Sequence, residues 1–270
     1  MDVVKKIKNY TYNERHCLGE GSFGKVYEGR SDEGMQVAIK KVEQRMISKD
    51  PYLRSSLESE INIMKKLSHK NIVKLHDLVM TSNSIYLIME FCAGGDLKRY
   101  CRNRKLSEDE ATMILKQICQ GFQEIVKKGI IHRDLKPANI LVHEGIFKIC
   151  DFGFAKFFGD TSRMAKTCVG TPIYMSPQVL HQQSYTNKTD IWSLGALYYE
   201  LMFGRLPFHG VSEDELYRNI IKGPLNIPSC TKPTYNLLKG MLEVDESKRY
   251  GWNNLFEIFE LGLVNDMGAK

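Results

Sequence analysis

The sequence predicts an α+β fold with two unequal lobes, a small β-rich N-lobe and a larger, mostly helical C-lobe. The first observation is a change in hydrophobic periodicity, because short alternating apolar runs fill residues 12–90 and helical spacing dominates after Gly94 and Gly95. The second is size, since 270 residues of which 43% are hydrophobic can bury a sizeable core. We expect the N-lobe over about 12–90, a hinge over about 91–95 and the C-lobe over about 96–262.

The expected strands of the N-lobe are short runs in which polar and apolar residues alternate. They read HCLGEGSFGKVYEGR over 16–30, QVAIKKV over 36–42, NIVKLHDLVM over 71–80 and SIYLIMEF over 84–91. One helix interrupts them over about 51–67, because Leu57, Ile61, Met64 and Leu67 recur at helical spacing.

The C-lobe is expected to consist mainly of helices. Ser107 and Glu110 form a capping-box pattern, and the apolar helical pattern that follows ends before Gly129. Further helices are expected over about 188–202, 213–222 and 234–242. A cleft should lie where the two lobes meet, near residues 90–96.

Composition argues against several classes of protein. The net charge is +6, and the 38 basic and 32 acidic residues are interspersed, so we expect no nucleic-acid interface. The seven cysteines are scattered and form none of the close pairs of metal and redox sites, which predicts reduced thiols in a cytoplasmic protein. We expect neither a signal peptide nor a transmembrane segment, since no uncharged apolar run approaches the ~20 residues that span a bilayer.

The segment Gly19-Glu20-Gly21-Ser22-Phe23-Gly24 matches G-x-G-x-x-G, a pattern that taken alone is a weak signal. In dinucleotide-binding folds these glycines open a helix, whereas here Lys25-Val26-Tyr27 continues as a strand. We therefore expect a hairpin tip that covers phosphates, and an ordinary glycine-rich hairpin is the alternative. The residues expected to approach the phosphates are Gly19, Gly21, Ser22 and Gly24.

Val37-Ala38-Ile39-Lys40 places a lysine in an otherwise apolar strand. A buried ammonium needs an anionic partner, and Glu60 fits the register of the following helix better than Glu58 does. Phosphate oxygens would be a second partner. The alternative is a lysine that reaches solvent from the edge of the strand.

The most specific segment is His132-Arg133-Asp134-Leu135-Lys136-Pro137-Ala138-Asn139. Asp134 can accept a hydrogen bond from an attacking hydroxyl, and Lys136 can neutralise charge on a phosphoryl group during its transfer. Asn139 offers a neutral oxygen ligand to Mg²⁺, and Asp151, in Asp151-Phe152-Gly153, offers a charged one. Together these residues predict phosphoryl transfer.

Taken in order, the motifs resemble those of the eukaryotic protein kinase family, over essentially residues 12–250. The resemblance implies that residues 1–270 form a single catalytic domain with the bilobal protein kinase fold, in which the helix over 51–67 is regulatory. It also implies ATP and Mg²⁺ as cofactors and transfer of the γ-phosphoryl group to hydroxyls of protein substrates.

The resemblance also implies a nucleotide site. Met89 is similar to the gatekeeper behind the adenine, Glu90 and Cys92 to the hinge residues whose backbone pairs with it, and Asp96 to the acid that binds ribose hydroxyls. The apolar residues similar to those that sandwich the adenine ring are Leu18, Val26, Ala38 and Leu141. Plain core packing is the alternative for each of them.

Substrate class and regulation are implied in the same way. Lys136 and Thr171 are similar to residues that distinguish serine/threonine kinases from tyrosine kinases. Arg133 is placed where it could hold a phosphate on the activation segment, and Thr167 is the expected site of that phosphate. The weaker candidates are Thr161 and Ser162. The alternative is a segment that is ordered without modification.

One position departs from the family pattern. The activation segment ends in Ser176-Pro177-Gln178, where the family usually has Ala-Pro-Glu, and the family glutamate pairs with an arginine that corresponds to Arg249. Glutamine accepts a hydrogen bond without the charge, so we expect a somewhat looser C-lobe in which catalysis is retained. Asp190 is expected to brace the catalytic loop.

Within the family, residues 91–97 (FCAGGDL) are most similar to the autophagy-initiating serine/threonine kinases. Those kinases carry C-terminal regions that bind partners, so regulatory proteins are expected partners beside ATP and protein substrates. Two other interpretations stay open, a pseudokinase scaffold and a small-molecule kinase. The residues that speak against the scaffold are Lys40, Asp134, Asn139 and Asp151, and the 170–178 segment speaks against the small-molecule kinase.

Overall fold

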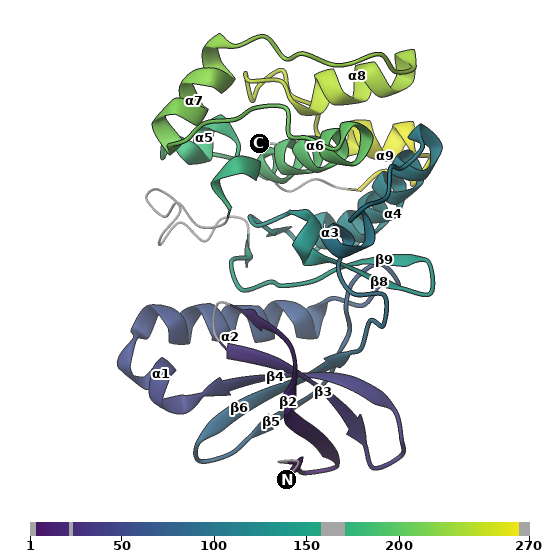
Figure 1. Ribbon diagram of the computed structural model, residues 1–270. Coiled ribbons are helices and arrows are strands. Elements are labelled where there is room, and N and C mark those ends of the chain that lie inside the picture. The colour runs from purple at the N-terminus through teal and green to yellow at the C-terminus, as the bar shows by residue number, and fades with distance from the viewer. Residues whose placement is uncertain (1–3, 22–23, 158–170, 265–270) are drawn as a thin grey trace.

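The computed structural model describes residues 4–21, 24–157 and 171–264, and it shows two lobes joined after Glu90 (Figure 1). The N-lobe contains a six-stranded sheet and the helices α1 and α2, and the C-lobe is mostly helical. The predicted α+β architecture with two unequal lobes is confirmed.

The N-lobe sheet is antiparallel and has the order β1-β2-β3-β4-β6-β5. Its strands are β1 (Val4–Ile7), β2 (Tyr10–Gly21), β3 (Gly24–Ser31), β4 (Gln36–Glu43), β5 (Leu75–Met80) and β6 (Ser84–Glu90). Strand β1 pairs with β2, so the sheet begins upstream of the alternating pattern that starts at residue 12. Of the predicted run over 71–80, the first four residues precede β5, and Ile72 instead forms a parallel bridge to Ile149.

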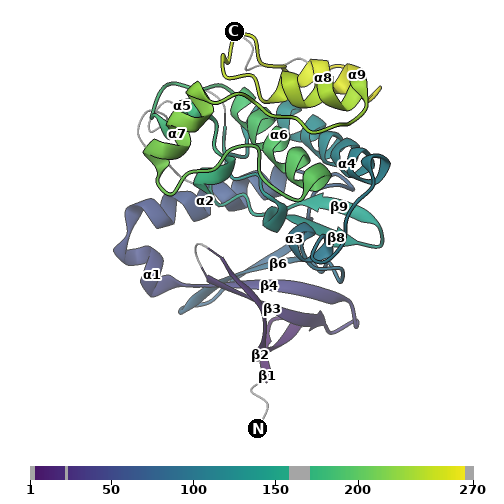
Figure 2. The same cartoon turned by 45° about the horizontal axis from the view of Figure 1, so that its top comes forward.

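Helix α2 (Pro51–Lys66) begins where the side chain of Asp50 accepts two backbone N–H groups of the first turn. Its buried side chains include Leu57 and Ile61, as the helical spacing predicted. In two views α2 lies between the sheet and the C-lobe (Figures 1 and 2). The preceding helix α1 (Gln44–Lys49) buries no residue, and for that reason no apolar periodicity indicated it.

The C-lobe is built around two long helices, α4 (Glu108–Lys127) and α6 (Lys188–Phe203). The shorter elements are α3 (Leu97–Tyr100), β7 (Ile130–Ile131), η1 (Pro137–Asn139), β8 (Ile140–His143), β9 (Ile146–Ile149), β10 (Lys156–Phe157), η3 (Pro172–Tyr174), α5 (Pro177–Leu180), α7 (Glu213–Lys222), α8 (Lys232–Met241) and α9 (Trp252–Ile258). All four predicted C-lobe helices are present, and α8 begins two residues early because Thr231 caps it.

Helix α6 forms the centre of the C-lobe core. Every residue from Thr189 to Tyr199 is buried, which is the pattern of a helix surrounded by protein on all sides. On a neighbouring face of the core, Trp252 of α9 stacks on Phe122 of α4 with ring centroids 4.4 Å apart.

Among the described residues, no helix has the length and apolar character needed to cross a membrane.

Arg249 is a cation buried in this lobe, 2% exposed. Its guanidinium donates to three backbone carbonyls and to Oε1 of Gln178, the last at 2.8 Å. Burial lowers the pKa of Arg249 to about 10, against the attraction of nearby carboxylates. Gln178 therefore occupies the place of the family glutamate and offers this cation a neutral partner.

Gln178→Glu should raise the melting temperature, because a carboxylate would give Arg249 a charge-assisted hydrogen bond. The new bond should raise the free energy of unfolding by about 1 kcal/mol, which corresponds to ~2 °C in melting temperature. Glutamate would also lose the hydrogen bond that Gln178 Nε2 donates to the carbonyl of Val244 at 2.9 Å, which reduces this gain. Differential scanning calorimetry measures the effect, with Gln178→Ala as the variant that loses both bonds. An unchanged or lower melting temperature in Gln178→Glu would show that the neutral glutamine does not loosen the lobe.

Candidate active site

Lys40 and Glu60 form a buried ion pair between β4 and α2. Their side chains are 6% and 2% exposed, and Lys40 Nζ lies 2.6 Å from Glu60 Oε1. Burial alone would lower the pKa of Lys40, but the negative charges of Glu60 and Asp151 raise it above its ordinary value, so the ammonium stays charged. Glu58, the alternative partner, is exposed and pairs with Arg54 at 3.0 Å.

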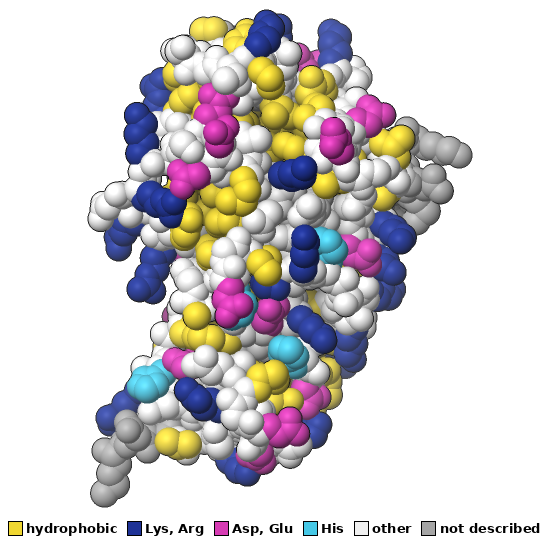
Figure 3. Space-filling model, turned by 90° about the vertical axis from the view of Figure 1, so that its right-hand side faces the viewer, with side chains coloured by type: hydrophobic (Ala, Val, Ile, Leu, Met, Phe, Trp, Pro, Cys, Tyr) yellow, Lys and Arg dark blue, Asp and Glu magenta, His cyan; other side chains and the backbone are white. Residues whose placement is uncertain are grey.

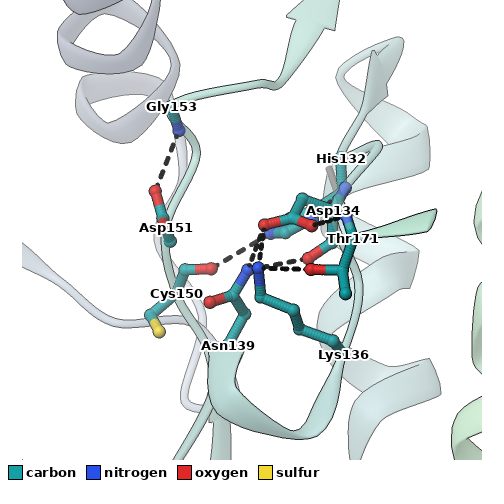
Figure 4. Close-up of polar contacts among 8 residues, drawn as sticks. All are labelled: His132, Asp134, Lys136, Asn139, Cys150, Asp151, Gly153 and Thr171. Atoms are coloured by element: carbon teal, nitrogen blue, oxygen red, sulfur yellow. Dashed lines mark hydrogen bonds and ion pairs between the residues drawn. The ribbon is translucent and has the colours of Figure 1, made fainter. Parts of the chain in front are cut away.

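Asp134 lies at the centre of a cluster of hydrogen bonds in the C-lobe (Figure 4). Lys136 Nζ and Asn139 Nδ2 donate to its Oδ2 at 2.7 and 2.9 Å, and the backbone N–H of Thr171 donates to its Oδ1 at 3.1 Å. Lys136 Nζ also donates to Thr171 Oγ1 at 2.9 Å. The structure thus brings together an acid, a lysine and a threonine that lie up to 37 residues apart in the sequence.

A second carboxylate, Asp190 of α6, holds the loop that carries Asp134. Its two oxygens accept the backbone N–H groups of His132 and Arg133, each at 2.8 Å. Arg133 has a φ of 69°, a left-handed conformation that is uncommon outside glycine and that these bonds help to hold. Burial raises the pKa of Asp190, and the two N–H bonds oppose that shift.

Asn139 and Asp151 present oxygen atoms close to this cluster (Figure 4). Asn139 uses its Nδ2 group to bind Asp134, which leaves its Oδ1 for another ligand. Asp151 accepts the N–H of Gly153 at 3.3 Å, and the N–H of Cys150 binds the carbonyl of Asn139 at 3.0 Å. An amide oxygen and a carboxylate fit Mg²⁺, whose remaining coordination positions would go to phosphates and water.

The expected adenine-pocket residues of β3, β4 and β6 lie on one face of the sheet. Ala38 and Lys40 are two residues apart on β4, so their side chains point to the same side. Val26 lies opposite Lys40, and Met89 lies opposite Ala38, which places them on that side too. This face therefore combines an apolar surface with the paired lysine.

Steric space differs among the glycines at the end of β2 and the start of β3. Ser22, between these two strands, lies outside the described residues. A Cβ on Gly24 would lie 2.0 Å from the carbonyl oxygen of Lys41, so the fold itself requires glycine there. At Gly19 nothing lies within 4 Å of such a Cβ, and at Gly21 the nearest atom is 3.8 Å away. Packing against the rest of the N-lobe does not explain these two glycines.

The side chain of Glu90, the last residue of β6, points away from the face that carries Ala38 and Lys40. Glu90 lies opposite Val37, the neighbour of Ala38 on β4, and its carboxylate pairs with Lys148 at 3.0 Å. Cys92 is buried, and burial raises the pKa of its thiol to about 12, so it stays protonated. With the Glu90 carboxylate paired and the Cys92 thiol buried, any contact of these two residues with adenine would come from their backbone.

Asp96 has a structural contact that was not predicted from the sequence. Its carboxylate accepts the N–H of Arg99 at 2.7 Å and caps α3, and one carboxylate oxygen is left for a ligand. The signal was present, since an aspartate directly before the run Leu97–Tyr100 is typical of a helix start. Leu141 lies beside Asp96 through an antiparallel bridge, and Leu18 on β2 is 49% exposed.

Residues 12–258 match the family described as the protein kinase domain. The chain belongs to the protein kinase family. It is 37% identical to the serine/threonine-protein kinase atg1 of Dictyostelium discoideum, over 99% of this chain and 41% of that protein. It is 35% identical to ULK1 of Homo sapiens (94% and 25%) and 35% identical to ATG1a of Arabidopsis thaliana (86% and 37%). The kinase chain thus spans less than half the length of these relatives, and the resemblance inferred from its motifs is confirmed.

Arg133 of the kinase contacts the start of the activation segment. Its Nε donates to the carbonyl of Phe154 at 2.6 Å, and its Nη1 donates to the hydroxyl of Tyr185 at 3.3 Å. Nη2 forms no hydrogen bond with the described part of the chain, and Thr167 lies outside that part. Tyr185 was not predicted, because it lies 52 residues after Arg133 and no local pattern indicates the contact.

Removing one member of the buried pair should destabilise the kinase, whereas replacing both should not. Glu60→Leu leaves a buried ammonium without its closest partner, and we expect the free energy of unfolding to fall by about 3 kcal/mol. Lys40→Met combined with Glu60→Leu should return it to within about 1 kcal/mol of the wild type. Urea denaturation of the three proteins measures this. If the single and double variants are equally unstable, the pair itself stabilises the fold.

Proposed function

We propose that this chain is an active serine/threonine kinase that transfers the γ-phosphoryl group of MgATP to hydroxyls of protein substrates. The cluster around Asp134 carries the proposal. It combines an acceptor for a hydroxyl proton with a cation that can meet a phosphoryl group, and Thr171 contacts both. Thr171 is also the first described residue in the C-terminal part of the activation segment, so a substrate bound against that part would lie next to Asp134.

In the proposed reaction Asp134 orients the attacking hydroxyl and accepts its proton. Lys136 lies 2.7 Å from Asp134 and would neutralise negative charge that develops on the phosphoryl group. Because Lys136 also donates to Thr171, its ammonium is held at a defined position before substrate arrives.

The remaining residues would hold the nucleotide. Lys40, kept in place by Glu60, would bind phosphate oxygens. Asn139 and Asp151 would hold Mg²⁺, which would neutralise negative charge on the phosphates. The adenine ring would lie against the apolar face that includes Ala38, with the hinge backbone at its edge and the glycine-rich hairpin over the phosphates.

We also propose a cellular role in autophagy initiation or related signalling, in the cytoplasm and with regulatory protein partners. The identity to relatives named atg1 and ULK1 supports this role. The FCAGGDL segment over 91–97, which lies between the two lobes, supports it from the sequence.

Asp134→Asn should lower phosphoryl transfer by about 100-fold or more, because the amide cannot accept the hydroxyl proton. The measurement is transfer of labelled γ-phosphate from MgATP to a generic serine/threonine acceptor protein. Mg-dependent ATP binding should stay unchanged, and Asp109→Asn, at an exposed position of α4, is the matched control. A wild type that binds MgATP and transfers no phosphate, whether or not Thr167 is phosphorylated, would identify the chain as a nucleotide-binding scaffold.

Thr167→Ala should lower the activity of protein that has been allowed to phosphorylate itself. Nη2 of Arg133, which forms no hydrogen bond with the described part of the chain, is the donor that we expect a phosphate at position 167 to use. Activity before and after phosphatase treatment, together with mass spectrometry of the segment, measures the effect. Ser162→Ala is the control and should behave as wild type. Equal activity of Thr167→Ala and wild type would mean that the segment is ordered without modification.

A further inference from the structure

A cavity of about 630 Å³ lies behind the hinge, on the side of the sheet opposite the nucleotide face. The polar side chains that line it are mostly basic or imidazole groups: His69, Lys70, Lys74, His76, His143 and Lys148. They come from the loop after α2, from β5 and from the β8–β9 hairpin, so both lobes contribute. Basic (Lys or Arg) and histidine side chains lie near the middle of the face that Figure 3 shows, with acidic side chains among them.

The charges in the cavity are only partly compensated. Lys148 is buried, and its Nζ lies 3.0 Å from Glu90 Oε1 and donates to the carbonyl of Lys70 at 2.6 Å, so Lys148 and Glu90 neutralise each other. The ammonium groups of Lys70 and Lys74 form no ion pair or hydrogen bond within the described residues. Three lysines against one glutamate leave two positive charges facing the same space.

The histidines add neutral hydrogen-bonding groups. His69 Nδ1 already accepts a backbone N–H at 3.1 Å, so in the neutral ring the proton is on Nε2, which can donate. Burial, with Lys70 and Lys74 as the next contributors, lowers the pKa of His69 and His76, which keeps both rings neutral at neutral pH. His143 Nδ1 is buried and has no hydrogen-bond partner among the described residues.

We propose that this cavity binds a phosphoserine or phosphothreonine within a protein segment. The ammonium groups of Lys70 and Lys74, which have no partner among the described residues, together match the charge of a phosphate monoester, which is close to −2 at neutral pH. The cavity volume lies within the usual range of ligand sites, about 300–1,000 Å³, and exceeds what a phosphate group alone would fill. Phe91 and Met35 also line it and would contact an apolar side chain next to the phosphorylated residue.

The cavity is separate from the proposed active site. Glu90 belongs to both, but its carboxylate faces the cavity, whereas its backbone would face the adenine. Phosphoserine and phosphothreonine are the products of the proposed kinase activity, so the inference rests on that function for the origin of its ligand. Binding of a phosphorylated segment in the cavity needs no catalysis, so that part of the inference does not depend on the proposed function.

Fluorescence anisotropy tests the proposal with a fluorescein-labelled peptide that carries one phosphoserine between two leucines, and with the same peptide without phosphate. We expect the phosphopeptide to bind at least about tenfold more tightly. Lys70→Glu combined with Lys74→Glu should weaken its binding by about tenfold or more while phosphoryl transfer to the generic acceptor is unchanged. Lys239→Glu, which changes an exposed lysine of α8, is the matched control and should bind as wild type.

Three results would overturn the proposal. The first is equal binding of the two peptides, and the second is unchanged phosphopeptide binding in the double variant. The third is displacement of the phosphopeptide by inorganic phosphate at the same molar concentration as by unlabelled phosphopeptide, which would identify a site for small anions. Lys-dependent phosphopeptide binding by a chain that transfers no phosphate would contradict the proposed kinase activity and leave this inference standing.

Discussion

The carboxylate of Asp190, buried within the central helix of the C-lobe, determines the shape of the loop on which the site depends. A buried charge is costly unless hydrogen bonds compensate it, and the N–H groups of His132 and Arg133 do so. Arg133 is thereby held in a left-handed conformation that directs Asp134 toward Lys136 and Thr171. The ring of His132 contacts the carbonyl of Cys150 at 3.1 Å, so the same anchor extends to the segment that carries Asp151.

The N-lobe is connected to this arrangement through Lys40 and Glu60. The pair joins β4 to α2, and the negative charge of Asp151 also acts on Lys40. Helix α2 makes a further contact with the C-lobe segment where Ser59 Oγ donates to the carbonyl of Ala155 at 3.4 Å. A shift of α2 would therefore separate Glu60 from Lys40 and disturb the chain beyond Asp151. The position of one helix thus couples two parts of the candidate site.

Alternation along the strands places two different surfaces on the same sheet. On β4 and β6, Ala38, Lys40 and Met89 face the proposed nucleotide cleft, whereas Val37 and Glu90 face the opposite side. The hinge follows directly after Glu90, so its backbone lies next to the cleft while the Glu90 side chain lies next to the basic cavity. A ligand in that cavity would contact the connection between the lobes without entering the cleft.

Local sequence determined the long helices, the strands with clear alternation and the residue types of the site. Helix α4 was predictable because Ser107 and Glu110 cap it and its apolar face is regular. Helix α1 buries no residue, and α3 and α5 are too short, so periodicity indicated none of the three. The choice of Glu60 over Glu58 also followed from helical register, which is a local property. Only the tertiary structure decided the contact of Arg133 with Tyr185 and the gathering of basic side chains from residues 69–148 in one cavity. Local patterns specify backbone conformation over one or two turns, but contacts between distant residues depend on how whole elements pack, and no short stretch of sequence contains that information.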